Sequence, residues 1–223
     1  GAAGITVHPR PDARHIRADD VHALKELVDT YPEAEFNIEG NPTAAPRVGY
    51  PGFDRLVEAA RPDQCTLVPD DDQQLTSDHG WDFSDDATVA ELGERVARYQ
   101  SWGPRVSLFM DPVAEQITAA KRTGAERIEL YTGPYADAVA AHGLDHPRSA
   151  ASWATYRDAA HHANDIGLGV NAGHDLDLVN LGRFVSMGGI AEVSIGHALI
   201  ADALEFGLVP TVERYLHILE KQE

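Results

Sequence analysis

The chain has 223 residues, of which 43% are hydrophobic and 24% are charged, and its 36 acidic residues outnumber its 18 basic ones to give a formal net charge of −18. This composition is ordinary for a globular protein and excludes disordered, collagen-like and coiled-coil chains. The negative field would repel nucleic acids and anionic membranes. A phosphorylated small molecule would therefore need a local group of cations, histidines or backbone amides.

A single cysteine and the absence of long apolar runs limit the cellular setting. Cys65 has no second cysteine to pair with, which excludes an internal disulfide and a cysteine-based zinc site. No stretch reaches the ~18 apolar residues of a membrane span, and no basic segment followed by an apolar one marks an export signal. We therefore expect a reducing, cytoplasmic location.

Short runs rich in β-branched residues alternate with helix-length segments along the whole chain. The first residues, GAAG, lack an initiator methionine and lead directly into the apolar ITV, so we expect an amino-terminal segment that is missing here. Seven strands are predicted, at Ile5–His8, Glu35–Glu39, Cys65–Val68, Val106–Met110, Arg127–Tyr131, Leu168–Ala172 and Glu192–Ile195.

Amphipathic patterns between the strands predict helices. One helix begins near the capping candidates Asp19 and Asp20, and another begins near Ser84 and Asp85. A last helix carries Pro210 near its start. The apolar faces of the three helices are formed by Val21, Leu24, Leu27 and Val28, by Val89, Leu92, Val96 and Tyr99, and by Val212, Tyr215, Leu216 and Leu219.

Alternation of strands and helices without a proline- or serine-rich linker predicts one parallel α/β domain over residues 1–223. Seven βα units favour a TIM-type (β/α)8 barrel whose first unit is missing from these residues. An open, doubly wound sheet is the alternative. It would usually carry a G-x-G-x-x-G loop after its first strand, and no loop here has that pattern.

Period-two alternation gives the strands a polar face, which is unusual because barrel interiors are normally filled by branched apolar side chains. The polar side chains that share a face are Thr6 with His8, Asn37 with Glu39, Glu129 with Tyr131, and Ser194 between Val193 and Ile195. An ionisable lumen costs stability unless it is paired or solvated, so these residues indicate chemistry.

Three acid/base residues are expected at the carboxyl ends of strands, where barrel enzymes place their catalytic groups. His8 ends the first strand, Glu39 ends the second, and His174 follows VNAG. A histidine near neutrality and a carboxylate whose pKa burial raises can exchange protons with a substrate in both directions. Each signal alone also fits a structural residue, whereas the three together favour a site.

Two glycine-flanked histidines follow the last two strands, His174 in AGHD and His197 in IGHA. Glycine lets backbone amides approach an anion, and each loop is expected to open a helix whose amino terminus favours negative charge. Asp175 is an awkward neighbour for a phosphate and is a candidate cap for the next helix. Two ordinary turn glycines are the alternative interpretation.

The remaining polar clusters have competing interpretations. Arg10, Arg14 and His15 follow His8 and fit either an anion clamp or a solvated, proline-stiffened turn. The sequence contains neither an H-x-H nor an H-E-x-x-H spacing, so these metal-binding motifs are absent. The histidine pair at 161–162 is expected on a helix surface. The aspartate triplet at 70–72 is expected in a solvated loop, with binding of a divalent cation as a minor possibility.

Eight sequence blocks, in order and over nearly the whole chain, resemble the pyridoxine 5′-phosphate synthase family of de novo vitamin B6 biosynthesis. They are GITVHPRPDARHI, EFNIEGNPT, CTLVPD, LTSDHGWD, VSLFMDP, RIELYTGPYA, GVNAGHDL and SIGHALI. The resemblance implies a TIM-type barrel with extra helices that assembles into a homo-octamer and needs no metal or organic cofactor.

The same resemblance implies the reaction and its residues. The family condenses 1-deoxy-D-xylulose 5-phosphate with 3-amino-2-oxopropyl phosphate and releases pyridoxine 5′-phosphate, phosphate and water. By motif match, His8 and Glu39 are similar to its proton acceptors, His174 to its proton donor, and Glu129 to the residue that stabilises its transition state. The substrate-binding positions fall on Arg10, His15, Thr76, Asp175, Gly196 and His197.

Two departures from the family pattern stand out. The family's first strand and helix, which carry an N-x-D-H element and an arginine, have no counterpart here, and Asp175 replaces the glycine of many relatives. Two alternatives to the synthase remain: a non-catalytic or degenerate sugar-phosphate-binding barrel, and a metal-dependent sugar-phosphate isomerase or epimerase. A binding protein would not need all four acid/base residues, and a metal enzyme would lose activity to a chelator.

Overall fold

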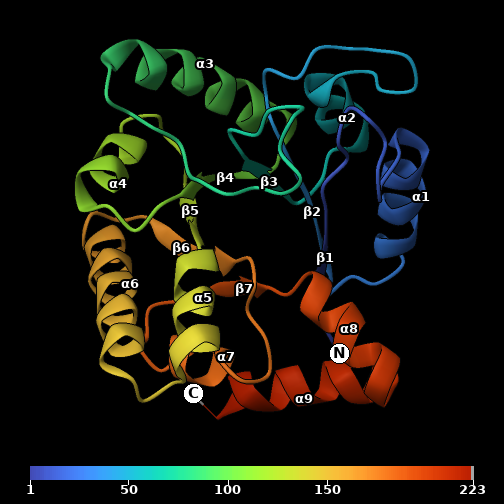
Figure 1. The fold of residues 1–223 in the computed structure, drawn as a ribbon. Coiled ribbons are helices and arrows are strands. Elements are labelled where there is room, and N and C mark those ends of the chain that lie inside the picture. Colours follow the sequence, from blue (N-terminus) through green and yellow to red (C-terminus); the bar gives the residue numbers. More distant parts are fainter. Residues whose placement is uncertain (222–223) are drawn as a thin grey trace.

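The computed structural model describes residues 1–221, in which a parallel sheet curves into a nearly closed barrel (Figure 1). Each strand pairs with the next strand along the chain, and all six pairings are parallel. The strands within residues 1–221 are β1 Gly4–Val7, β2 Glu35–Gly40, β3 Gln64–Leu67, β4 Arg105–Met110, β5 Arg127–Tyr131, β6 Gly169–Gly173 and β7 Glu192–Ser194. The predicted TIM-type barrel is confirmed, with each strand end within one residue of its expected place.

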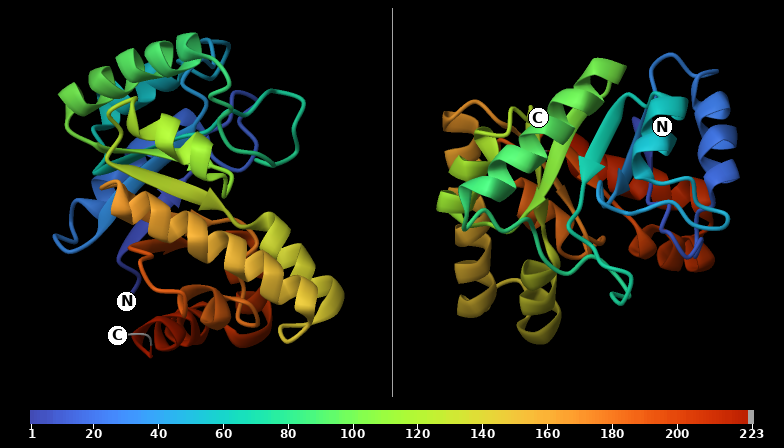
Figure 2. Two further views of the ribbon diagram at one scale, coloured as in Figure 1. Left: turned by 90° about the vertical axis from the view of Figure 1, so that its left-hand side faces the viewer. Right: turned by 90° about the horizontal axis from the view of Figure 1, so that it is seen from above.

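Helices cover the outside of the sheet and follow most of the strands (Figure 2). Those within residues 1–221 are α1 Ala18–Val28, α2 Phe53–Ala60, α3 Asp86–Trp102, α4 Ala114–Lys121, α5 Gly133–His142, α6 Pro147–Asp165, α7 Leu181–Val185, α8 His197–Phe206 and α9 Leu208–Glu220. None of these helices is both long and apolar enough to cross a membrane.

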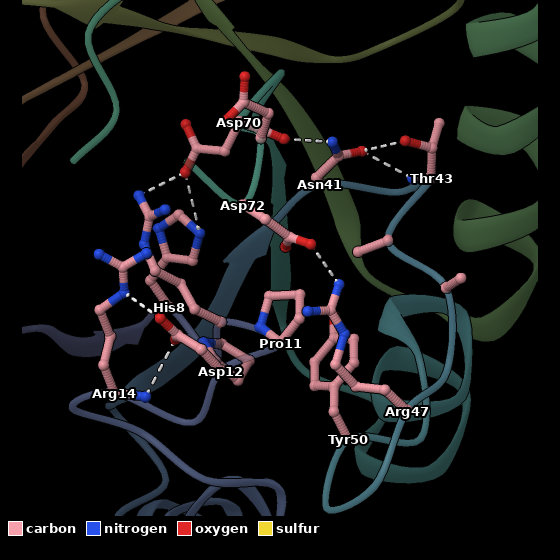
Figure 3. Close-up of a pocket in the computed structure, with 15 residues that line it drawn as sticks. His8, Pro11, Asp12, Arg14, Asn41, Thr43, Arg47, Tyr50, Asp70 and Asp72 are labelled. Carbon is pink, nitrogen blue, oxygen red and sulfur yellow. Dashed lines mark hydrogen bonds and ion pairs between the residues drawn. The ribbon is translucent and has the colours of Figure 1, made fainter. Parts of the chain in front are cut away.

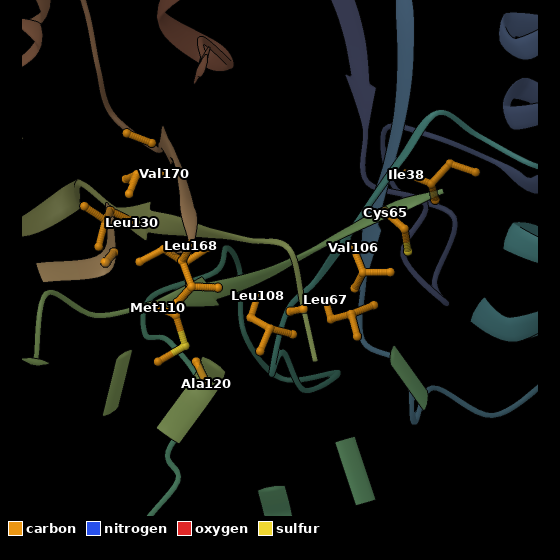
Figure 4. Close-up of a cluster of buried hydrophobic side chains, with 14 of the residues drawn as sticks. Ile38, Cys65, Leu67, Val106, Leu108, Met110, Ala120, Leu130, Leu168 and Val170 are labelled. Atoms are coloured by element: carbon orange, nitrogen blue, oxygen red, sulfur yellow. The ribbon is translucent and has the colours of Figure 1, made fainter. Parts of the chain in front are cut away.

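The hydrophobic core lies between the sheet and its helices. Apolar side chains on the outer face of the strands, such as Ile38, Leu67, Leu108 and Met110, are fully buried there (Figure 4). Burying a side chain of this size contributes about 1.5–3 kcal/mol relative to its exposed state. Cys65 belongs to the same layer as a buried free thiol, so the outer face, and not the lumen, supplies the apolar packing that stabilises the barrel.

The helix starts show which sequence signals were informative. Asp85 caps α3 by accepting a hydrogen bond from the Thr88 amide at 2.7 Å, as predicted. The prediction for α1 was wrong, because Arg17 is its cap and Asp20 lies in the first turn. From there the Asp20 carboxylate accepts a hydrogen bond from the Arg17 amide at 2.8 Å and closes a capping box. Pro210 lies in the first turn of α9, where proline is tolerated.

The lumen is polar, as the alternation predicted. Asn37 donates hydrogen bonds to Thr66 at 3.1 Å and to Thr6 at 3.3 Å, so adjacent strands are linked on their inner face. Gln64 on β3 reaches Glu192 on β7 at 2.8 Å, although the two strands are not neighbours in the sheet. Such a contact spans the inside of the barrel, and it fixes which face of each strand is the lumen.

Candidate active site

His8 and Arg10 lie in the loop that follows β1, and both contact Asp70 in the loop that follows β3. Arg10 Nη2 donates to Asp70 Oδ2 at 2.5 Å, and His8 Nε2 lies 3.4 Å from the same oxygen. The Arg10 side chain is 8% exposed and the Asp70 side chain 6%. Burial and the nearby charge of Arg10 lower the pKa of His8 to about 3, so its imidazole is neutral at physiological pH.

A cavity of about 260 Å³ opens beside these three side chains (Figure 3). Its walls come from the loops after β1, β2 and β3, at the carboxyl ends of the strands. On the exposed rim Arg47 pairs with Asp72 at 2.6 Å. The volume is suited to a small molecule, and its position is the one at which barrel enzymes hold their substrates.

Glu39, the next-to-last residue of β2, is a half-buried carboxyl group that has no ion-pair partner within residues 1–221. Burial, the charges of Glu129 and Asp70, and a hydrogen bond with Glu129 raise its pKa well above the usual range. Its Oε1 atom is buried and has no hydrogen-bond partner within residues 1–221. The protonated form of Glu39 is therefore favoured over that of an exposed carboxyl group.

Glu129, on β5, is a second carboxyl group in the lumen and is 3% exposed. Burial and the charge of Glu192 raise its pKa to about 7, an effect that hydrogen bonds from Thr66 and Glu39 oppose. The Thr66 hydroxyl is 3.5 Å from Glu129 Oε2. Two adjacent carboxyl groups with raised pKa values can hold one proton between them and release it near neutrality.

Gly173, at the end of β6, leaves the space that Glu129 occupies. A Cβ atom at this position would come within 2.2 Å of Glu129 Oε1, which no real side chain tolerates. The glycine was predicted to bring backbone amides close to an anion, but its steric role is to make room for the Glu129 carboxyl group. Gly196 is different, because a Cβ there would meet open space.

His174 follows β6 and contacts groups from two other parts of the site. Its Nε2 atom is 2.8 Å from the Thr76 hydroxyl, and its Nδ1 atom is 3.1 Å from Asp175 Oδ2. Tyr131 packs edge-on against the ring at 5.3 Å between centroids. The charge of His174 also contributes to the lowered pKa of His8, so the predicted proton donor and acceptor lie around one lumen.

The backbone at 174–175 is strained in a way that explains the unusual aspartate. His174 has φ 87° and Asp175 has φ 59°, and both lie in the left-handed region that favours glycine. Aspartate tolerates this region better than most residues. Asp175 was a candidate cap for the next helix, and that interpretation was wrong: α7 begins only at Leu181, and the Asp175 carboxylate instead faces His174 and, at 3.6 Å, His197 Nδ1.

The predicted binding residues His15, Gly196 and His197 are not among the residues that line the cavity. His197 is the first residue of α8 with a side chain 75% exposed, and Gly196 is the residue before that helix. His15 is exposed with φ 65°. Arg14 pairs with Asp12 at 2.7 Å and donates to backbone carbonyls of residues 74 and 75. It therefore ties two loops together and does not stand free as an anion clamp.

Asp70 is the site residue that the sequence interpretation missed. The triplet at 70–72 was assigned to a solvated loop, yet Asp70 is buried while Asp71 and Asp72 are exposed. No sequence signal marked it, because β3 ends at Leu67 and the two-residue alternation of a strand does not extend to Asp70. Within residues 1–221, no group of three or more His, Cys, Asp and Glu side chains could hold a metal ion.

The chain is similar to a known protein family and to several named relatives. The model of the family described as pyridoxal phosphate biosynthesis protein PdxJ matches residues 1–221. A pyridoxine 5′-phosphate synthase from Xanthomonas oryzae pv. oryzae is 54% identical over 220 residues, which are 98% of this chain and 83% of that protein. The Xanthomonas campestris pv. campestris protein of the same name is 56% identical with the same coverage. A Xylella fastidiosa synthase is 53% identical and covers 99% of this chain and 82% of its own length.

Solved structures agree on the fold. A 3-hexulose-6-phosphate synthase superposes with a TM-score of 0.60 and 11% identity, covering 97% of this chain and 87% of its own. A structure described as native KDPGal has a TM-score of 0.58 and 11% identity, covering 97% and 81%. At this identity the likeness concerns the barrel alone. The match to the family model over residues 1–221, together with relatives more than 50% identical, shows that the chain belongs to the PdxJ family of pyridoxal phosphate biosynthesis proteins.

Proposed function

We propose that this enzyme is a pyridoxine 5′-phosphate synthase that condenses 1-deoxy-D-xylulose 5-phosphate with 3-amino-2-oxopropyl phosphate. The observation that carries the proposal is the pair of carboxyl groups, Glu39 and Glu129, in a lumen that also holds His8 and His174. A ring-closing condensation needs many proton transfers and no redox step. Four acid/base groups around one lumen suit that requirement.

Each acid/base residue has a role in this proposal. His8 is neutral and can accept a proton, and Glu39 is a strong base once it has lost its own proton, because its pKa is raised. His174 donates a proton to a leaving oxygen. Glu129, with a pKa near 7, provides a negative charge that stabilises a cationic imine in the transition state.

The proposed sequence begins with attack of the amine nitrogen on the ketone carbon of the deoxysugar phosphate. The adduct loses water to give an imine, and a base removes a proton from the adjacent carbon. Loss of phosphate, attack of an enol carbon on the second carbonyl, and loss of water then close the aromatic ring. Glu39 and His8 remove protons in these steps, and His174 returns them to departing oxygens.

The substrate-binding residues are proposed to hold the two phosphate ends. Arg10 borders the cavity beside His8 and offers a charge-assisted contact. His15, Thr76 and His197 are proposed to contact the substrates from outside the side chains that line this cavity, and the Gly196 segment presents the amino terminus of α8. Asp175 orients His174 and His197 and would contact a substrate hydroxyl group in place of a phosphate.

We further propose that the enzyme is a cytoplasmic homo-octamer. Large apolar side chains are exposed together on α8 and α9, among them Ile200, Leu204, Leu208 and Val209. A surface of this kind is typical of an interface. A single buried cysteine fits a reducing compartment. Light scattering should give a mass eight times that of the chain, and a monomer would contradict the assembly.

The experiment for the proposed activity is a product assay. The purified protein is mixed with both phosphorylated substrates in the presence of a chelator, and pyridoxine 5′-phosphate and inorganic phosphate are followed together. Equal release of both is expected. Loss of activity with chelator would favour a metal-dependent sugar-phosphate enzyme, and ligand binding without product would favour a non-catalytic binding barrel.

A further inference from the structure

Asp70 lies at the point where three loops meet. One of its oxygens, Oδ2, accepts a hydrogen bond from Arg10 at 2.5 Å and one from Ser77 at 3.0 Å, and it faces His8 Nε2 at 3.4 Å. Its backbone carbonyl accepts a hydrogen bond from Asn41 in the loop after β2. The side chain therefore has three partners and the backbone a fourth, and Asp70 borders the cavity (Figure 3).

The charges around His8 explain why this carboxylate matters. Arg10, Arg14, His15 and His174 all lie close enough to oppose a positive charge on the imidazole. Asp70 is the carboxylate in contact with the ring and faces Nε2. If His8 accepts a proton during the reaction, the imidazolium ion needs a partner of opposite sign in this buried place.

Arg10 depends on the same oxygen for its position. Its side chain is 8% exposed, and a buried guanidinium without a partner of opposite charge is strongly unfavourable. A contact to Asp70 offsets that cost while Arg10 still lines the cavity. One carboxylate oxygen thus sets the positions of a proton acceptor and of an anion-binding side chain at once.

We propose that Asp70 is a positioning residue of the reaction: its carboxylate holds Arg10 and His8 toward the phosphorylated substrate and is the counter-charge for His8 when it becomes an imidazolium ion. This inference rests on the proposed roles of His8 and Arg10. Asp70 is acidic, yet it helps to hold a negatively charged substrate because it orients the cationic side chain of Arg10.

The test compares Asp70→Ala with two matched variants. Asp70→Ala should lower kcat/KM about 100-fold, the size expected when an acid/base group is misplaced. Asp78→Asn removes an exposed carboxylate of the same loop, which pairs with His79, and should leave kcat/KM within about twofold. Asp70→Asn keeps the shape of the side chain and removes only the charge, so it should be impaired as well. Circular dichroism and thermal unfolding establish that each variant is folded.

Rescue by a small anion separates the charge from a structural role. Asp70→Ala leaves a gap that opens into the cavity, and formate should restore kcat at least tenfold. Formamide, which is neutral and of the same size, should not. A folded Asp70→Ala protein that keeps full activity, or one that formate leaves inactive, would overturn the proposal.

Two further arms separate this proposal from the proposed function. His8→Gln should be inactive in the same assay; if it is active, the role of His8 fails independently of Asp70. Calorimetry of 1-deoxy-D-xylulose 5-phosphate binding gives a readout without turnover. Asp70→Ala should weaken this binding at least tenfold, because Arg10 loses its partner, whereas unchanged affinity would contradict the positioning of Arg10.

Discussion

The two ends of the barrel lumen are both polar, but they treat their charges differently. At the amino-terminal end of the strands, Arg105 bonds to Glu35 at 2.6 Å and Arg127 to Glu192 at 2.5 Å, so two cations offset two anions. Gln64 bridges the two glutamates. Paired groups of this kind have a structural role and no free capacity for chemistry.

At the carboxyl-terminal end the pairing is incomplete. Glu39 and Glu129 face each other without a cation in contact, and the pKa of each is raised. The backbone at His174 and Asp175 has positive φ. Unsatisfied groups and strain cost stability and persist where function requires them. Chemistry in this barrel therefore belongs to the end at which two carboxyl groups lack a cation partner.

Removing the acid at position 39 should have the largest effect. Glu39→Gln keeps the size of the side chain but cannot release or accept a proton, so turnover should fall by about 10³-fold or more. Phosphate-ligand affinity should stay nearly intact. Steady-state kinetics and calorimetry on the same preparation measure the two effects, and full activity in the variant would contradict the assigned role.

Filling the space beside Glu129 should have the next largest effect. Gly173→Ala places a Cβ within 2.2 Å of Glu129 Oε1, so the carboxyl group must move and kcat should fall about 100-fold. Gly182→Ala, inside α7, is the matched control for the fold, because its Cβ would make an ordinary contact with Ile218 Cγ2 at 3.4 Å, and its thermal unfolding temperature should not fall. Equal unfolding temperatures for Gly173→Ala and wild type, with equal kcat, would contradict the steric argument.

The two ends should respond to pH with opposite signs. Glu129 has its pKa raised to about 7 from 4.5, so the folded state binds more protons between these values, and its contribution to the free energy of unfolding falls as pH rises through that window. Glu35 has its pKa lowered, so its contribution is present above about pH 4.5 and is lost as pH falls below it.

Denaturant unfolding of three proteins checks this contrast. The stability of wild type relative to Glu129→Gln should decrease from pH 5 to pH 7.5, and its stability relative to Glu35→Gln should decrease when pH falls from 5 to 3.5. If the stability contributions of both glutamates changed in the same direction with rising pH, the two ends would not be electrostatically distinct.

Disturbing the paired end should have the smallest effect on catalysis. Gln64→Leu removes the bridge between Glu35 and Glu192 and should lower the free energy of unfolding by about 1–3 kcal/mol. Turnover should remain within about twofold, since no acid/base group changes its position. A large loss of kcat in a folded Gln64→Leu protein would show that the amino-terminal end of the barrel takes part in the chemistry, and would contradict this prediction.

The sequence predicted the elements and the faces well because both depend on local patterns. Alternation along each strand is a two-residue period, so it located Glu39 and Glu129 on the inner face without knowledge of their partners. Their mutual contact could not be predicted in this way. The register places Glu39 opposite Thr66, whose row continues through Ser107 to Arg127, so the pair meets only across the lumen through the stagger of the closed barrel.

Other features were hidden because they depend on side-chain packing. Asp70 belongs to a run of three identical residues, and only the folded loop separates the buried one from its two exposed neighbours. Gly173 resembles a phosphate-loop glycine in sequence. A side chain at this position is excluded because it would collide with the carboxyl group of Glu129 on another strand. Both required the tertiary contacts between loops and strands.

The most direct test of the unpaired carboxyl groups is infrared spectroscopy at pH 8. A carboxyl group that keeps its proton has a carbonyl stretching band well separated from the bands of carboxylates. Wild type should show this band, and the difference spectrum against Glu39→Gln should assign it to Glu39. A wild-type spectrum with no protonated carboxyl band at pH 8, or one that Glu39→Gln leaves unchanged, would contradict a raised pKa for Glu39.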